Sequence, residues 1–226
     1  MLYIVATPIG NLSDITLRAL DVLRSVDLIA CEDTRHTLKL LNHYGINKPL
    51  TSYYEHNKLS KGEHLIKLLK EGKNIALVSD SGTPGISDPG FHIVKLALEN
   101  DISVSPIPGA SALAAALSVA GIPANRFVFE GFLPVKSGAR KKKLLELSKP
   151  GKTIILYESP YRFLKLLDEV KEVFGDVEVT VCREITKKFE EIKKGPIDAV
   201  LAYYKANKTQ ATRGEFSVIL NPASRD

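Results

Sequence analysis

The sequence of 226 residues has no tryptophan, one methionine and only two cysteines. Cys31 and Cys182 stand far apart, each in an apolar run, which argues against a disulfide framework and predicts two buried thiols in a reducing compartment. No cysteines and histidines have the spacing of metal ligands. The longest apolar runs are too short for a membrane span, and the start, 1–8, lacks the charged region of a signal peptide. We therefore expect a cytoplasmic protein with no metal and no membrane partner.

Two common phosphate-binding motifs are also absent. The sequence contains no Gly-x-x-x-x-Gly-Lys-Ser/Thr loop and no Gly-x-Gly-x-x-Gly turn after a strand. A net charge of +5 is a mild indication of nucleic-acid binding. The basic runs 140–143, 187–188 and 193–194 all lie in the second half, which favours a phosphate-contacting face there, although each run alone is typical of a solvated helix face.

The first half alternates apolar strands with helical patterns. The candidate strands are Leu2–Ala6, Asp27–Cys31, Pro49–Tyr53, Asn74–Ser79 and Ser103–Ile107. Strands that alternate with helices indicate a mainly parallel sheet covered on both faces. An alanine-rich helix, 110–120, then ends at Gly121-Ile122-Pro123, which predicts a domain boundary between residues 1–121 and 122–226.

The second half is less regular. Its candidate strands are Phe127–Glu130, Thr153–Tyr157, Glu178–Arg183, Phe189–Ile192 and Phe216–Leu220. Two of them follow each other without a helix around 183–192, which predicts a hairpin and a mixed sheet. Ser159-Pro160 is typical of a helix start, and the stripe Phe163, Leu166, Leu167 and Val170 predicts the buried face of that helix.

The segment Ser79–Gly90 is the most informative part of the chain. It follows the buried run Ile75–Val78 and precedes a helical pattern, which is where an open α/β sheet builds its ligand site. Its glycines permit close backbone approach, while Asp80 and Asp88 would repel a phosphate. A neutral or cationic ligand rich in hydroxyl and amine groups fits better, and S-adenosylmethionine meets that description. The alternative is an ordinary turn with helix-capping residues.

Further motifs occur in order along nearly the whole chain. They are Tyr3–Thr16, Cys31–Arg35, Ser79–Gly90, Pro108–Ala112, Phe129–Pro134, Tyr157–Arg162, Arg183–Glu191 and Arg213–Phe216. Together they resemble the bacterial methyltransferases of type I that act on small-subunit ribosomal RNA, a branch of the tetrapyrrole methylase superfamily. The Ala-Thr-Pro-Ile-Gly-Asn-Leu start and the Glu-Asp-Thr-Arg motif favour this RNA branch, because ring-methylating relatives usually carry a Gly-x-Gly-x-Gly-Asp loop at the first strand.

The resemblance implies two α/β domains, an S-adenosylmethionine site in the cleft between them and a homodimer. It also implies methylation of a cytidine ribose 2′-hydroxyl in 16S ribosomal RNA of the small subunit, near the decoding centre. The residues expected to bind the cofactor include the two aspartates of the Ser79–Gly90 segment. They are Pro8, Asp80, Gly82, Thr83, Ser87, Asp88, Ser111 and Ala112. For Ser111, capping of its helix is an equal alternative.

The ribose hydroxyl is a weak nucleophile, so its proton must be removed or its developing charge stabilised. The candidates are Glu32, Asp33, Arg35, Asp88, Glu184 and Lys187, and the sequence does not single out the base. For 32–35 the alternative is a helix cap with a surface ion pair. Two other functions stay open: a methyltransferase for a tetrapyrrole-like small molecule, and a non-catalytic ribosome-assembly protein that binds RNA. We also expect the cations Arg140–Lys143 to face solvent and contact RNA phosphates.

Overall fold

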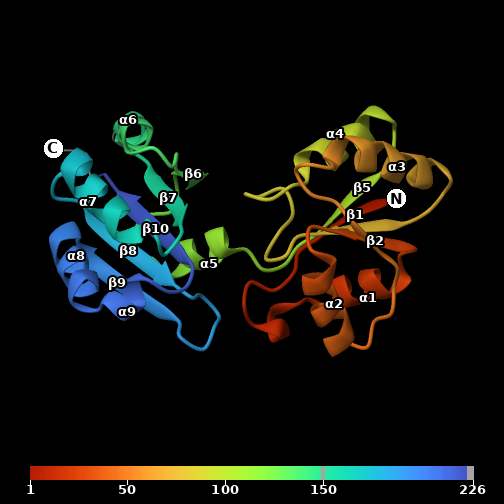
Figure 1. Ribbon diagram of the computed structural model, residues 1–226, viewed down its shortest axis with the longest axis horizontal. Coiled ribbons are helices and arrows are strands. Elements are labelled where there is room, and N and C mark those ends of the chain that lie inside the picture. The colour runs from red at the N-terminus through yellow and green to blue at the C-terminus, as the bar shows by residue number, and fades with distance from the viewer. Residues whose placement is uncertain (149–150, 223–226) are drawn as a thin grey trace. The chain divides into compact units, whose positions relative to one another are not determined.

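The chain divides into two compact units, Met1–Ser111 and Ala112–Asp226. The computed structural model describes residues 1–148 and 151–222 (Figure 1). This division corrects the predicted boundary after Gly121, because the alanine-rich helix packs with the second unit rather than the first. Each unit contains one sheet and its own apolar core.

The sheet of the first unit is parallel throughout. Its strands are β1 (Leu2–Val5), β2 (Leu28–Cys31), β3 (Leu50–Ser52), β4 (Ile75–Val78) and β5 (Val104–Ile107). They lie in the order β3-β2-β4-β1-β5, and each neighbouring pair is parallel, as predicted. Successive side chains of β4 point to opposite faces, so Ile75 and Leu77 enter one core and Ala76 and Val78 the other. A sheet buried on both faces explains why these strands are almost uniformly apolar.

Helices cover both faces of this sheet. They are α1 (Leu17–Ser25), α2 (Thr34–His43), α3 (Lys58–Lys70) and α4 (Phe91–Glu99), with a short 3-10 helix η1 (Leu12–Asp14) after β1. Apolar residues of α1 and α2 enter one core, and those of α3 and α4 enter the core on the opposite face, as Figure 1 shows. The loops at the carboxyl ends of the strands contain buried residues, such as Thr7 and Ser79, as well as exposed ones, such as Ser81 and Ser87.

The sheet of the second unit is mixed. Its strands are β6 (Phe127–Phe132), β7 (Thr153–Glu158), β8 (Glu178–Arg183), β9 (Glu191–Pro196) and β10 (Phe216–Asn221). Their order is β6-β7-β10-β8-β9; β6 and β7 are parallel and the other pairs antiparallel. The predicted hairpin is the β8–β9 pair, which confirms the mixed sheet.

One face of this second sheet is covered by several helices and the other by α5 (Ala112–Val119). The covering helices are α6 (Ser137–Leu147), α7 (Phe163–Phe174), α8 (Ile197–Ala206) and α9 (Lys208–Ala211). The helix predicted to start at Ser159-Pro160 begins at Phe163, because Ser159–Arg162 forms a turn with a hydrogen bond from Arg162 N–H to the Ser159 carbonyl. Its buried stripe is as predicted.

Candidate functional site

Polar loops gather at the carboxyl edge of the first sheet. The strand ends Val5, Cys31, Val78 and Ile107 are in register across β1, β2, β4 and β5. The segments that follow these strands therefore leave the same edge of the sheet. In an open parallel sheet, this edge is where ligands bind.

The Ser79–Gly90 segment is fastened to the loop after β1. Thr7 and Gly82 exchange two backbone hydrogen bonds of 2.8 and 3.1 Å, and the buried Thr7 hydroxyl donates to the Ser79 carbonyl at 3.1 Å. Gly82 has a φ of +87°, a conformation that favours glycine at this bridge. The Thr83 hydroxyl donates to the Ala110 carbonyl at 3.1 Å, which ties the same segment to the loop after β5. The structure thus brings Pro8, Gly82 and Thr83 into one loop cluster.

Close packing fixes the far end of the segment as well. A Cβ on Gly90 would lie 2.8 Å from the Gly85 nitrogen, so only glycine fits where α4 begins. Ser87 is exposed, with a positive φ of 65°. Such a backbone persists only where its surroundings hold it, and it often accompanies a ligand site.

Three carboxylates lie close enough at this edge to influence one another's ionisation: Glu32 after β2, and Asp80 and Asp88 after β4. Burial, together with the charges of Glu32 and Asp80, raises the pKa of Asp88 to about 6. Burial and the charge of Asp80 also raise the pKa of Glu32. The two strand ends are linked directly, because the Asp33 N–H donates to Asp80 Oδ1 at 3.1 Å. The cluster is therefore anionic and suited to a cationic ligand or to proton transfer near neutral pH.

Asp33 and Arg35 have a structural explanation. Asp33 is the N-cap of α2 and accepts a hydrogen bond from the Arg35 N–H at 2.8 Å. The exposed Arg35 guanidinium pairs with the same carboxylate at 2.7 Å. These bonds hold the pKa of Asp33 well below its ordinary value. The helix-cap and ion-pair alternative is the arrangement that the structure contains.

Glu184 and Lys187 belong to the second unit, where they bond to each other. Lys187 Nζ lies 3.0 Å from Glu184 Oε1 and 2.9 Å from Glu215 Oε2. Glu184 Oε1 also accepts from the Glu215 N–H at 3.0 Å, and a Cβ on Gly214 would come within 2.6 Å of Glu184 Cγ. These contacts fix the turn between β8 and β9, so the groups have structural partners and are weaker candidates for proton transfer.

Ser111 and Ala112 mark the passage between the two units. Ser111 follows the loop after β5, and Ala112 is the first residue of α5. Both side chains are partly exposed. Their place at the end of the β5 loop is compatible with the predicted cofactor contact and adds no further partner.

The basic run at α6 differs from its prediction. Arg140 is 1% exposed, and its guanidinium forms an ion pair with Glu169 and donates to the carbonyls of Pro134 and Val135. The expectation that all four cations face solvent was therefore wrong for Arg140, because Glu169 of α7 supplies a buried partner. Lys141 pairs with Glu172 and Lys143 with Glu130. Lys142 is exposed, and none of the described residues forms an ion pair with it.

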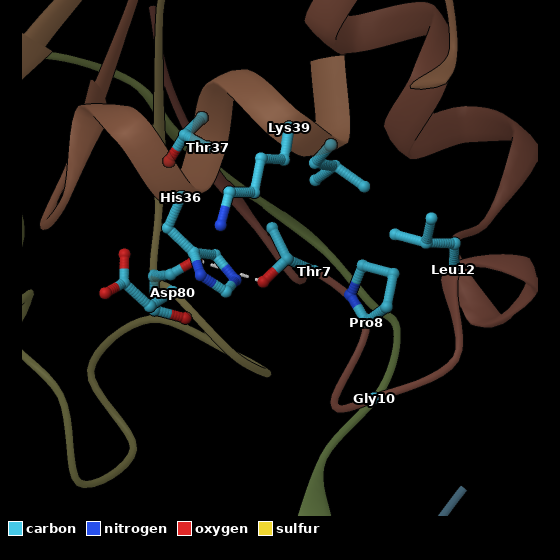
Figure 2. Close-up of a pocket in the computed structure, with 10 residues that line it drawn as sticks. Thr7, Pro8, Gly10, Leu12, His36, Thr37, Lys39 and Asp80 are labelled. Carbon is cyan, nitrogen blue, oxygen red and sulfur yellow. Dashed lines mark hydrogen bonds between the residues drawn. The ribbon is translucent and has the colours of Figure 1, made fainter. Parts of the chain in front are cut away.

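A pocket of about 300 Å³ opens beside the loop cluster, within the first unit (Figure 2). Its lining residues are Thr7, Pro8, Gly10, Leu12, His36, Thr37, Lys39, Leu40, Ser79 and Asp80. Three of these residues, His36, Thr37 and Lys39, were not predicted, although they follow the predicted site strand on the first turns of α2. Their position on the helix directly after that strand was the signal that could have identified them.

Within the described ranges 1–148 and 151–222, no group of three or more His, Cys, Asp or Glu side chains is arranged to hold a metal ion. No helix in those ranges has both the length and the apolar character needed to cross a membrane. Cys31 and Cys182 are both buried free thiols, as predicted.

Comparisons with known proteins agree with this architecture. Residues 1–201 match the model of the tetrapyrrole (corrin/porphyrin) methylases. A cobalt precorrin-4 methyltransferase superposes with a TM-score of 0.70 and 18% identity, covering 97% of this chain and 94% of that one. A Thermus thermophilus uroporphyrin-III C-methyltransferase, solved with S-adenosyl homocysteine, has a TM-score of 0.65 and 16% identity, covering 97% and 96%. These two structures share the fold.

Sequence relatives are closer. The chain is 47% identical to the Pseudomonas aeruginosa protein named ribosomal RNA small subunit methyltransferase I, over 97% of this chain and 78% of that protein. It is 49% identical to the Bacillus subtilis protein of the same name, over 100% and 76%. The chain therefore belongs to the tetrapyrrole methylase family and, within it, to the group of ribosomal RNA small subunit methyltransferases I. Its class of reaction is methyl transfer.

Proposed function

We propose that the chain transfers a methyl group from S-adenosylmethionine to the ribose 2′-hydroxyl of a cytidine in 16S ribosomal RNA, near the decoding centre. The observation that carries this proposal is the identity of 47–49% with small-subunit ribosomal RNA methyltransferases over nearly the whole chain. Action in the cytoplasm, as a homodimer, on the small ribosomal subunit is part of the same proposal.

The loop cluster fits the charge of this cofactor. S-adenosylmethionine carries a sulfonium and an ammonium group, and Glu32, Asp80 and Asp88 supply negative charge at the strand ends. Gly82 and Thr83 lie in a backbone bridge where a ligand can approach the main chain closely. With them we assign Pro8, Ser87, Ser111 and Ala112 to cofactor binding. The cofactor supplies an activated methyl group, so the protein mainly binds, orients and accepts a proton.

We propose that Asp88, which is partly buried beside Glu32 and Asp80 at the carboxyl edge of the first sheet, removes the proton from the 2′-hydroxyl. A general base is most effective when its pKa is close to the working pH, and the pKa of Asp88 is raised to about 6. Glu32 is the second candidate, since its pKa is also raised. Asp33 is a poor base because its bonds to Arg35 hold its pKa low.

Transfer of a radiolabelled methyl group tests the substrate class. Small ribosomal subunits that lack the modification, naked 16S RNA and a uroporphyrinogen should be offered in parallel. We expect label in the RNA of the subunits and none in the tetrapyrrole. Label in the tetrapyrrole would favour the small-molecule reaction, and label in neither, with measurable cofactor binding, would favour a non-catalytic assembly protein.

A further inference from the structure

Most residues of the pocket beside the loop cluster have no role in cofactor binding; Pro8 and Asp80 are the two that we assign to the cofactor. Five of its lining residues come from the loops after β1 and β4, one comes from η1 and four come from α2, which places it on the α2 side of the Thr7–Gly82 bridge. The residues assigned to the cofactor after Asp80, from Gly82 to Asp88, do not line it. The pocket is therefore next to the cofactor loops and separate from most of them.

The pocket contains one carboxylate that can accept hydrogen bonds, Asp80, and two side chains that can donate them, His36 and Lys39. One oxygen of Asp80 accepts from the Asp33 N–H at 3.1 Å, while its second oxygen has no hydrogen bond among the described residues. Figure 2 shows the His36 ring and the Lys39 side chain extending toward Asp80 and Thr7. Neither side chain forms an ion pair with the described residues. Their donors and the second Asp80 oxygen are available to a ligand.

A buried hydroxyl supports the presence of a ligand. Thr37 is 3% exposed and lines the pocket, and its Oγ1 lies near the Cys31 thiol without a hydrogen bond of good geometry among the described residues. Buried polar groups without partners are uncommon in native proteins and point to a missing ligand or water. Apolar walls come from Pro8, Leu12 and Leu40, beside the polar Thr7 and Ser79. Apolar walls with a few polar groups suit the ring of a nucleobase.

We infer that this pocket binds the cytosine base of the target nucleotide and selects it over uracil. The inference rests on the proposed function. Carboxylates accept hydrogen bonds from the cytosine 4-amino group, so Asp80 would face that group and Lys39 the adjacent ring nitrogen or carbonyl oxygen. Uracil presents the opposite pattern, because its O4 would face the Asp80 carboxylate and its N3–H would face the Lys39 ammonium. The same pocket that accepts cytosine thus repels uracil.

Adenine has the same amino group beside a ring nitrogen, so the cofactor is a second source of this chemistry. We assign the pocket to the substrate because four of its lining residues lie on α2, whereas Gly82, Thr83 and Ser87, which we assign to the cofactor, lie outside it. Only Pro8 and Asp80 belong to both sets. The two sources differ in what they predict. A substrate pocket sets the preference between bases, whereas a cofactor pocket sets the affinity for S-adenosylhomocysteine.

The variant Asp80→Asn is the sharpest probe of this assignment. The asparagine Oδ1 can still accept from the Asp33 N–H, while the second position changes from an acceptor to a donor that suits uracil O4. Lys39→Met removes the opposing donor from an exposed helix position. Asp14→Asn, an exposed carboxylate of η1 that does not line the pocket, is the matched control.

Each variant should be assayed on small subunits reconstituted with cytidine or uridine at the target position, and titrated with S-adenosylhomocysteine by calorimetry. We expect the wild type and Asp14→Asn to prefer cytidine by about 5- to 150-fold. Asp80→Asn and Lys39→Met should both reduce this preference to within about threefold. Cofactor affinity should stay nearly unchanged in Lys39→Met, whereas Asp80→Asn should weaken it modestly because one of the three carboxylates that attract the cofactor's ammonium group is lost. If Asp80→Asn does not fold, the preference of Lys39→Met for cytidine over uridine tests the inference on its own.

Two results would overturn the inference. An unchanged preference for cytidine in both folded variants would remove the base from this pocket. Loss of S-adenosylhomocysteine affinity with an unchanged preference would place the cofactor's adenine there instead. A wild type that methylates neither subunit would contradict the proposed function itself, which separates the two failures.

Discussion

Asp88 is the residue of the proposed site whose pKa is most clearly raised by folding. Its carboxyl group is partly buried beside Glu32 and Asp80, so its ionised form is disfavoured and its pKa rises from 3.8 to about 6. Placing charges of one sign together costs stability and is a common feature of functional sites. The structure therefore links a loss of stability at neutral pH to the group that we assign to proton transfer.

The variant Asp88→Asn should separate these two effects. The folded-state pKa is raised, so the stabilising contribution of Asp88 is complete below about pH 4 and is lost as pH rises through 6. Thermal unfolding should show the variant more stable than the wild type at pH 7.5 and similar to it at pH 4. Methylation should fall by about 100-fold or more, and the wild-type rate should rise with pH through about 6. A variant with the wild-type rate and pH profile would remove Asp88 as the base.

Asp33 and Arg35 should differ in their effect on stability. Asp33→Ala removes the N-cap of α2 and should lower the free energy of unfolding by about 1 kcal/mol. Arg35→Ala removes only an exposed ion pair, and a change under about 0.5 kcal/mol is expected. Urea unfolding of both variants measures this difference. Equal losses would mean that the ion pair, rather than the cap, holds the helix start.

At the scale of elements, α6 and α7 are joined by a buried ion pair. Arg140 and Glu169 are 1% and 3% exposed, and Ser137 also donates to the Glu169 carboxylate at 2.6 Å. Burial would raise the pKa of Glu169, but the bonds from Arg140 and Ser137 outweigh it and lower the pKa overall. Arg140 is thus a structural residue within a basic run.

Arg140→Met should destabilise the second unit by about 3–5 kcal/mol, because it leaves the Glu169 charge buried without its partner. The double variant Arg140→Met/Glu169→Leu should recover much of that loss, since it removes both charges. Denaturant unfolding of the single and double variants measures both quantities. A single variant as stable as the wild type would show that the pair contributes little.

Lys142 is the cation of this run that is best placed for RNA. It is exposed, while Lys141 and Lys143 have glutamate partners. Lys142→Gln should flatten the slope of log affinity for the small subunit against log salt by about 1 unit, through loss of one phosphate contact. Lys141→Gln, the matched control, should change the slope less. Equal slopes for wild type and Lys142→Gln would make this run a solvated helix face.

Some properties of the secondary-structure elements could be predicted from the sequence, and others could not. The alternation of strands and helices was enough to predict the parallel sheet, because each apolar run has to be buried on both faces. Burial of Arg140 could not be predicted, since its partner Glu169 lies on another helix. The alanine-rich α5 was given to the wrong unit because small apolar residues on every side do not indicate which sheet they cover.

At the scale of the whole molecule, each unit has its own sheet and core, and the candidate site residues divide between them. Glu32, Asp80 and Asp88 come together in the first unit because parallel strands end at one edge, which the sequence could indicate. Their shifted pKa values and the pocket on α2 depend on three-dimensional distances that no spacing in the sequence reports. From the sequence, Glu184 and Lys187 were candidates for catalysis like the carboxylates of the first unit. Only the structure shows that they form an ion pair with each other.

The central claim is that the methyl group goes to a cytidine ribose. The most direct measurement is mass spectrometry of nucleosides from 16S RNA of small subunits incubated with the protein and S-adenosylmethionine, with fragments mapped to position. We expect a single new 2′-O-methylcytidine near the decoding centre, which is absent when Asp88→Asn replaces the wild type. A methyl group on a base, on another nucleoside, or on no RNA at all would contradict it.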